Sequence, residues 1–259
     1  MSASELLYGE RSADDINCPL ASLVPDARGV IKISDVEIFY SLFELPMSTT
    51  VARLSTSLHP SIPAVMGTSF WRVPASDFGE FQLAYVGLAC RAGIKPRHMV
   101  IGAWCDNPAA ARFFRDRYGF DCQPAEIRCR ETYDRVLGWV AAERETILEI
   151  VATALVPIVG GGGSVKYSPP LNLAFIGGQT KLAQFEASYD FKRVSRGVVQ
   201  ASTYVASEVG DAAVAPTYPI SGTFAVCDVD LLPVRFQVDL LTPAEHGGAT
   251  KVTGKREIG

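Results

Sequence analysis

The sequence from Trp104 to Ile127 reads W-C-D-N-P-A-A-A-R-F-F-R-D-R-Y-G-F-D-C-Q-P-A-E-I. Asp106 or Asn107 can accept hydrogen bonds from the free amides at the start of a helix, and Pro108 suits the first helical position. Gly119 suits the end of the same helix, because glycine adopts the left-handed backbone conformation without strain. This stretch therefore predicts one short helix that begins at Pro108 and ends before Gly119.

On both sides of this helix, apolar residues recur at every second position, which is the pattern of half-buried strands. Residues 30–40 show the pattern clearly, with β-branched and aromatic side chains prominent. Further strands are predicted at residues 81–89, 98–104, 126–130, 135–142, 146–156, 171–176, 182–189, 197–206 and 224–239. A less regular pattern predicts a second helix over residues 48–58. Many short strands with few helices favour an antiparallel sheet rolled into a barrel or sandwich.

The composition is that of a globular protein, with 259 residues of which 48% are hydrophobic and 20% charged. It predicts an N-terminal arm over residues 1–28, one domain over residues 29–242 and a polar C-terminal tail over residues 243–259. A net charge of -4 and scattered basic residues argue against nucleic acid as a partner. No stretch reaches the roughly 20 apolar residues of a membrane span, and the first residues do not resemble a signal peptide. We therefore expect a cytoplasmic protein.

The spacing of cysteines and histidines gives no sign of a metal site. The six cysteines include no C-x-x-C pair, and the three histidines lack the H-x-x-x-H and H-x-H spacings of zinc ligands. Cysteines of a cytosolic protein are mostly reduced and pack well in a core. We therefore expect reduced cysteines, no metal and no cofactor.

The stretch from Trp104 to Ile127 also resembles part of the acetoacetate decarboxylase superfamily. In that superfamily an apolar strand leads through an Asp-Asn turn and a short helix to an aromatic-Pro-Lys-Lys element. Aligned without a gap from the Asp-Asn turn, the family's helix arginine falls on Arg115 and its two lysines fall on Cys122 and Gln123. The chain is therefore similar to a divergent member that lacks the Schiff-base lysine.

The resemblance extends over roughly residues 77–241. Residues 77–80 read D-F-G-E and resemble the segment that carries a catalytic glutamate, which maps onto Glu80. Residues 221–233 read S-G-T-F-A-V-C-D-V-D-L-L-P and resemble the family's closing strand. The resemblance implies a mainly β fold of the α+β type, namely a cone-shaped antiparallel β-barrel with one or two short helices. It also implies an apolar cavity and subunits that assemble into a homo-oligomer.

The residues that stand in place of the lysines support a different chemistry. A Schiff-base decarboxylase needs an amine that stays neutral in its pocket, and neither Cys122 nor Gln123 supplies one. Cys122 is either a reactive thiolate or a structural thiol. Gln123 either hydrogen-bonds a substrate carbonyl or enol, or is a polar turn residue. Glu80 is the predicted general acid or base if it faces a dry cavity; the alternative is a turn carboxylate in solvent.

Substrate contacts are predicted for one basic and four aromatic side chains: Arg115, Phe120, Tyr118, Trp71 and Trp104. The arginine either contacts substrate or holds the helix through an ion pair, and the aromatic residues either line the cavity or pack in the core. Without a nucleophile, acid/base catalysis and substrate positioning remain. The sequence thus predicts a small-molecule lyase or cyclase-like enzyme acting on a polyketide-type or β-keto intermediate of specialised metabolism.

Two alternatives to this function stay open. The first is a β-keto acid decarboxylase with a relocated lysine, for which Lys32 and Lys192 lie in strand-like contexts. The second is a non-catalytic barrel that only binds a ligand.

Overall fold

The computed structural model describes residues 7–12, 21–23, 29–158, 166–244 and 252–254. Its strands are β1 (Ala21–Leu23), β2 (Ile31–Glu44), β3 (His59–Pro60), β4 (Val65–Val73), β5 (Phe81–Ala92), β6 (Lys95–Cys105), β7 (Gln123–Pro124), β8 (Glu126–Glu131), β9 (Arg135–Ala142), β10 (Glu145–Pro157), β11 (Pro170–Ile176), β12 (Gln179–Gln184), β13 (Ala187–Tyr204), β14 (Tyr218–Leu231), β15 (Phe236–Asp239) and β16 (Val252–Gly254). Its helices are α1 (Met47–Arg53) and α2 (Pro108–Tyr118).

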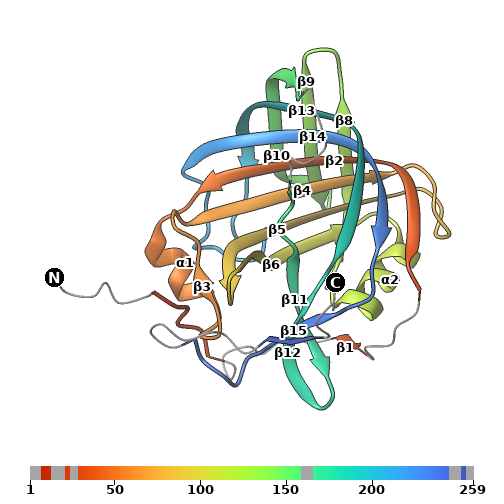
Figure 1. Cartoon of the computed structure of the whole chain (residues 1–259). Coiled ribbons are helices and arrows are strands. Elements are labelled where there is room, and N and C mark those ends of the chain that lie inside the picture. Colours follow the sequence, from red (N-terminus) through yellow and green to blue (C-terminus); the bar gives the residue numbers. More distant parts are fainter. Residues whose placement is uncertain (1–6, 13–20, 24–28, 159–165, 245–251, 255–259) are drawn as a thin grey trace.

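One large sheet joins all of these strands (Figure 1). The strand order is β16-β15-β12-β11-β6-β5-β4-β2-β14-β13-β10-β9-β8, and β1, β3 and β7 attach to β11, β5 and β6. Within the described part of the chain, β8 and β16 end this order without pairing with each other. Pairing is antiparallel except between β1 and β11, β6 and β11, and β6 and β7. The prediction of a mainly β, largely antiparallel fold with two short helices is confirmed.

Register across the central strands places polar side chains in one row. Tyr40 of β2 pairs with Ser69 of β4, which in turn pairs with Tyr85 of β5. On the other side of β2, Thr223 of β14 also pairs with Tyr40. Because directly paired residues point to the same face of a sheet, these four side chains lie side by side on one face.

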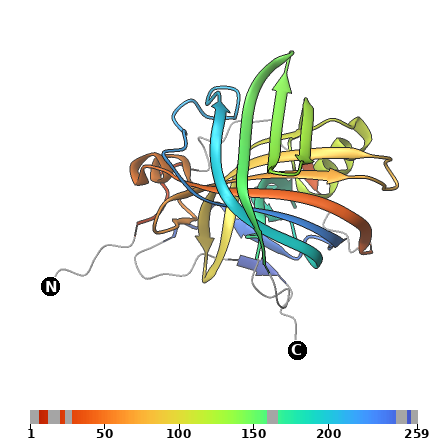
Figure 2. The ribbon, with the colours of Figure 1, turned by 90° about the horizontal axis from the view of Figure 1, so that it is seen from above.

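The two faces of the central strands carry two separate cores. The first core includes Phe39, Phe70 and Trp104, and it lies where β8, β9 and β10 fold over the sheet. The second core includes Trp71 and Phe114, and it lies on the opposite face under α2. Successive residues of a strand alternate between faces, so Phe70 and Trp71 belong to different cores. Figure 2 shows how strongly the strands of the sheet curve.

Helix α2 has the bounds predicted for it. The side chain of Asn107 accepts hydrogen bonds from the amides of Ala109 and Ala110, and Gly119 ends the helix with a left-handed φ of 76°. The second predicted helix, over residues 48–58, is shorter: α1 ends at Arg53, and the chain continues through a turn into β3. The capping residues that mark α2 are absent at α1, where Pro46 makes no side-chain cap.

Three strand predictions need correction. β4 was not predicted, because most of its residues are buried on both faces and the sequence does not alternate. Residues 182–189 were predicted as one strand, but β12 ends at Gln184 and β13 begins at Ala187. Residues 224–239 likewise divide between β14 and β15. At each division the chain leaves one neighbouring strand and begins to pair with another.

The segments outside residues 29–242 also contribute to the sheet. β1 pairs with β11, and β16 pairs with β15. The two terminal segments therefore each add a short strand. Neither helix in the described ranges has the length and apolar character that a membrane-spanning helix requires.

Candidate functional site

Glu80 lies at the turn before β5, and its carboxylate faces solvent. Its side chain is 61% exposed, and Oε1 lies 3.5 Å from a guanidinium nitrogen of Arg72. Of the two settings left open for Glu80, the structure shows the turn carboxylate in solvent and not the dry cavity. Its catalytic role stays a prediction, now without the burial that was to support it.

Cys122 and Gln123 are neighbours in sequence but line different pockets. Cys122 packs beside the second core and lines a pocket with Cys105 and Arg115. Burial raises the pKa of the Cys122 thiol above its ordinary value, and Cys105 and Asp121 act in the same direction. The structure thus favours a protonated, structural thiol over a reactive thiolate.

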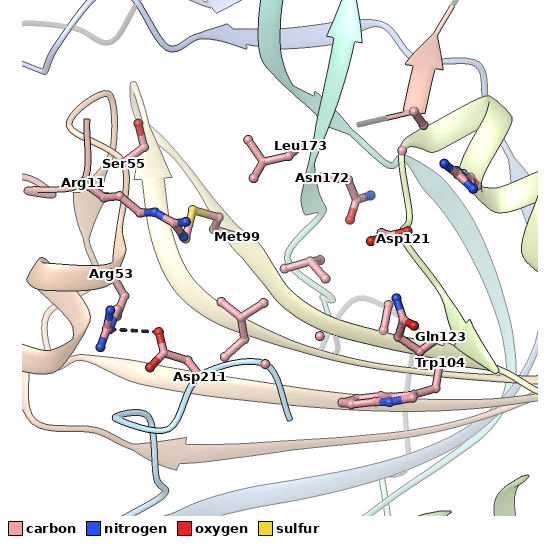
Figure 3. Close-up of a pocket in the computed structure, with 18 of the residues that line it drawn as sticks. Arg11, Arg53, Ser55, Met99, Trp104, Asp121, Gln123, Asn172, Leu173 and Asp211 are labelled. Atoms are coloured by element: carbon pink, nitrogen blue, oxygen red, sulfur yellow. Dashed lines mark ion pairs between the residues drawn. The ribbon is translucent and has the colours of Figure 1, made fainter. Parts of the chain in front are cut away.

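Gln123 lines a second pocket of about 350 Å³, which we call the β6 pocket (Figure 3). Residues 99–104 of β6 form one wall of this pocket, and Trp104 and Asn172 lie close to Gln123 in the view of Figure 3. Arg115 is exposed and lines both pockets, and it makes no ion pair with any residue that the structure describes. The ion pair that was the alternative for Arg115 is therefore not formed within this part of the chain.

The remaining predicted residues are core side chains. Tyr118, the last residue of α2, and Phe120, which follows the helix, are fully buried, and both rings contact Phe185. The Tyr118 hydroxyl donates to the carbonyl of Leu232 at 2.8 Å. Trp71 is buried in the same core and donates from Nε1 to the Ser69 hydroxyl at 2.9 Å. Their substrate contacts stay predictions, whereas their packing roles are visible.

A group of tyrosines and one histidine lies on the face of the sheet that carries the second core. We call this group, which consists of Tyr40, Tyr85, His98, Tyr167 and Tyr189, the tyrosine–histidine cluster. The Tyr40 hydroxyl lies 3.1 Å from Nε2 of His98. The ring centroids of Tyr40 and Tyr167 are 5.2 Å apart, and those of Tyr167 and Tyr189 are 5.1 Å apart. Four strands and the segment before β11 supply these side chains.

Two glycines on adjacent strands make room for the Tyr40–His98 pair. A Cβ atom on Gly67 would lie 2.8 Å from the Tyr40 hydroxyl and 3.0 Å from Nε2 of His98. Gly87, which pairs with Gly67 across the sheet, would bring its own Cβ to 3.1 Å from Cβ of His98. At 2.8 Å the Tyr40 hydroxyl or the backbone would have to shift, and the other two distances are tighter than most Cβ contacts. Glycine at both positions therefore permits the two rings to meet over the sheet.

Several polar atoms of this region are buried without a partner among the described residues. They are Nδ1 of His98, which lies next to the Ser168 backbone, and the hydroxyls of Tyr167 and Thr223, which lie near each other. A buried polar group that forms no hydrogen bond costs about 1–3 kcal/mol. Native structures usually meet such groups with a ligand or an ordered water. The cluster thus contains polar groups whose hydrogen-bonding capacity the described residues do not fully satisfy.

Burial keeps the cluster uncharged near neutral pH. It raises the pKa of Tyr40 well above the ordinary value, and neighbouring Tyr85 and Tyr167 add to the effect. Burial raises the pKa of Tyr85 to about 12, against hydrogen bonds that lower it. Burial lowers the pKa of His98 to about 4, although the Ser168 backbone acts to raise it. The tyrosines therefore keep their protons as donors, and His98 is a neutral imidazole.

The cluster lies next to solvent on one side, since Tyr167, Tyr189 and Phe191 each keep part of their surface exposed. Neutral hydroxyl donors in an apolar surrounding can stabilise negative charge that develops on a substrate oxygen. No group of three potential metal ligands comes together in the described ranges. The neutral hydroxyls of the cluster can thus act as hydrogen-bond donors.

Sequence reasoning did not find the tyrosine–histidine cluster. Tyr40 and His98 were assigned only to predicted strands, because strand alternation shows which residues share a face but not which strands meet. One signal was available: Tyr40 occupies an inward position of the strand over residues 30–40, where a polar ring needs a partner. The partner itself, 58 residues away, is visible only in the folded chain.

We compared the chain with known proteins by sequence and by fold. No protein-family model and no curated protein matches the sequence. Among solved structures, the acetoacetate decarboxylase of Legionella pneumophila matches with a TM-score of 0.70 and 17% identity, over 80% of this chain and 86% of that chain. The enduracididine biosynthesis enzyme MppR matches with a TM-score of 0.65 and 15% identity, over 82% and 88%.

A third match is an acetoacetate decarboxylase-like enzyme of Sphingomonas wittichii, with a TM-score of 0.57 and 12% identity, over 85% of this chain and 94% of that chain. All three identities are low, so the likeness concerns the fold. The fold predicted from the resemblance is confirmed.

Proposed function

We propose that this chain, which has the acetoacetate decarboxylase-like fold, is a small-molecule lyase or cyclase-like enzyme that forms no imine with its substrate. The observation that carries the proposal is the buried hydrogen bond between Tyr40 and His98, beside the unpartnered hydroxyl of Tyr167. These groups can perform acid/base catalysis and position a substrate in an apolar surrounding.

The chemistry follows from the protonation states of the pair. Nε2 of His98 faces Tyr40, and the Ser168 backbone favours a proton on the ring, so we place the ring proton on Nδ1 and let Nε2 accept from the Tyr40 hydroxyl. The Tyr40 oxygen can then take a proton from the carbon next to a substrate carbonyl while it passes its own proton to Nε2. The electron pair of the broken C–H bond moves onto the carbonyl oxygen, where the neutral Tyr167 hydroxyl stabilises the charge. The product of the step is an enol or enolate.

Such a step suits a polyketide-type or β-keto intermediate, which enolises before it loses water, cleaves or closes a ring. The aromatic side chains Tyr167, Tyr189 and Phe191 offer flat faces to an apolar carbon skeleton, and their ring centroids lie 5.1 to 5.9 Å apart. A neutral carbonyl compound is the proposed substrate class.

The position of the lysines argues against the relocated-lysine alternative. Lys32, Lys95, Lys166 and Lys192 are exposed and Lys181 is half-buried, so no lysine in the described ranges lies in a core. Lys192 forms ion pairs with Asp35 at 2.7 Å and Asp228 at 2.6 Å. An imine-forming lysine needs a neutral amine, which these carboxylates disfavour because they raise its pKa.

The proposal can be tested without the natural substrate, through exchange of the hydrogen atoms next to a carbonyl group. We expect the wild-type chain to accelerate deuterium exchange into 2-tetralone, a neutral aromatic ketone, when NMR follows the reaction in heavy water. Tyr40→Phe should lower the accelerated rate on the order of 10²-fold, the usual effect of losing one positioned proton-transfer group. Tyr133→Phe, at a fully exposed tyrosine, is the matched control and should exchange at the wild-type rate.

Four results would contradict the proposal. Equal rates for wild type and Tyr40→Phe would remove the pair from catalysis, and an absence of acceleration by the wild type would favour the non-catalytic binding barrel. Loss of exchange in Glu80→Gln instead of Tyr40→Phe would return the acid/base role to Glu80. Separately, a stable mass adduct after borohydride treatment with a β-keto acid would establish imine chemistry.

A further inference from the structure

The β6 pocket is a built cavity that the proposed chemistry does not use. Met99 and Trp104, which line it, belong to the first core, whereas the tyrosine–histidine cluster lies on the face of the second core. Its volume of about 350 Å³ lies at the lower end of the range for small-molecule sites. The β6 pocket is therefore separate from the tyrosine–histidine cluster.

Asn172 of β11 presents an unsatisfied acceptor at this pocket. The residue is only 2% exposed, and its Nδ2 donates to the carbonyl of Tyr118 at 3.1 Å. Because a backbone carbonyl only accepts, this bond determines which end of the amide is the nitrogen. The other end, Oδ1, is buried without a hydrogen-bond partner among the described residues. It needs an N–H or O–H donor from a bound molecule.

The edge of β6 adds backbone groups at the same place. On this edge, β11 pairs with His98 and Met99, and β7 pairs with Trp104 and Cys105. Residues 100–103 lie between these pairs, line the pocket and have no strand partner on this edge in the described chain. Unpaired strand edges offer alternating N–H donors and C=O acceptors. A ligand with a similar alternation of donors and acceptors matches such an edge.

The charges around the pocket balance. Among the described residues, three basic and three acidic side chains line it, namely Arg11, Arg53, Arg115, Asp121, Glu208 and Asp211. Arg53 is held by Asp211 at 2.8 Å, as the dashed line in Figure 3 shows. A balanced lining gives no net field for an anion or a cation, so it favours an uncharged ligand. Trp104, Met99 and Leu173 supply apolar surface for its carbon atoms.

The wall of the β6 pocket that includes Gly210 packs closely against the backbone of β6. A Cβ on Gly102 would overlap the carbonyl of Val209, and a Cβ on Gly210 would overlap the carbonyl of Ile101. Gly210 also has a φ of 113°, which other residues rarely adopt. With the Arg53–Asp211 ion pair, these approaches hold the wall in place. The pocket is thus formed before a ligand arrives, which favours binding.

We propose that the β6 pocket is a second ligand site, for a small uncharged molecule with an imide or lactam edge. The N–H of such an edge donates to Oδ1 of Asn172, and its carbonyl groups accept from the free edge of β6 or from the Gln123 amide. The carbon skeleton lies against Trp104 and Met99. This site is independent of the chemistry proposed for Tyr40 and His98, so either can fail alone.

The test compares two probes that differ in one donor. Glutarimide carries the N–H, and N-methylglutarimide replaces it with a methyl group. We expect glutarimide to bind the full wild-type chain about tenfold more tightly by NMR titration, the effect of one hydrogen bond to a buried acceptor. In Asn172→Ala this preference should fall to about one, whereas Gln200→Ala, at an exposed strand glutamine, should keep it.

Equal binding of the two probes to the wild type would overturn the proposal, and so would failure of both to bind at millimolar concentration. A preference that survives in Asn172→Ala would place the imide elsewhere and also overturn it. If Asn172→Ala does not fold, because it loses the bond to Tyr118, the wild-type comparison still decides the outcome.

Discussion

At the level of single residues, Glu80 and His98 have opposite surroundings. Glu80 follows a turn glycine, and its side chain remains exposed beside Arg72. His98 lies under Tyr40 in the sheet, where burial penalises its charged form and lowers its pKa to about 4. Burial therefore distinguishes the two residues as acid/base candidates, and it is a property of the folded chain rather than of residue type.

The depressed pKa of His98 predicts how stability depends on pH. The unfolded chain takes up a proton at His98 near pH 6.5, and the folded chain does so near pH 4. Between these values the unfolded state binds more protons, so stability present at neutral pH is lost as the pH falls. From about pH 7.5 to about pH 5 we expect wild type to lose about 2 kcal/mol more than His98→Gln.

Urea unfolding at the two pH values measures this difference. Gln is the suitable replacement because its amide can still hydrogen-bond the Tyr40 hydroxyl while carrying no titratable proton. Equal losses in the two proteins would mean that His98 titrates normally in the folded state.

At the level of elements, α2 is connected to β5 by one side chain. Oδ1 of Asn107 caps the helix through the amides of Ala109 and Ala110, while its Nδ2 donates to the carbonyls of Phe78 at 2.9 Å and Glu80 at 3.2 Å. The same residue therefore starts the helix and holds the turn before β5. This double role explains why such a short helix has a fixed position against the second core.

Asn107→Ala should lower the free energy of unfolding by about 2 kcal/mol. Loss of an N-cap alone costs roughly 0.5–2 kcal/mol, and the two bonds to the turn place this position at the upper end. Asp116→Ala, on the exposed side of the same helix, should cost less than about 0.5 kcal/mol. Urea denaturation of both variants gives the comparison, and equal costs would show that the cap does not hold the helix.

At the level of the whole molecule, close packing of β9 on β4 determines how far the sheet folds over its first core. A Cβ on Gly138 of β9 would overlap the ring of Phe70 in β4, so the two layers meet at a glycine. Phe70 in turn stacks on Phe39 with ring centroids 5.9 Å apart. The homo-oligomer implied by the family resemblance also concerns the whole molecule, and it stays a prediction.

Gly138→Ala should destabilise the fold by about 1–3 kcal/mol, because the added methyl group has no space and the layers must separate. Thermal unfolding followed by circular dichroism measures the cost, with Ser188→Ala on an exposed position of β13 as the control. A variant as stable as wild type would show that the β9 layer shifts freely over Phe70.

The sequence by itself determined the features that depend on neighbours along the chain. Asn107, Pro108 and Gly119 marked the start and end of α2, because caps act within one helical turn. Alternation identified most strands and hence the mainly β fold. It missed β4, whose burial on both faces removes the alternation, and it joined β12 to β13, since a change of strand partner has no local mark.

Only the tertiary structure decided which side chains form sites. Cys122 and Gln123 are adjacent in sequence yet line different pockets, because consecutive side chains point to different sides of an extended chain. Tyr40 and His98 are separated by 58 residues and meet through strand register over Gly67 and Gly87. Burial, pKa and unpartnered atoms arise from such distant contacts, which local sequence patterns do not contain.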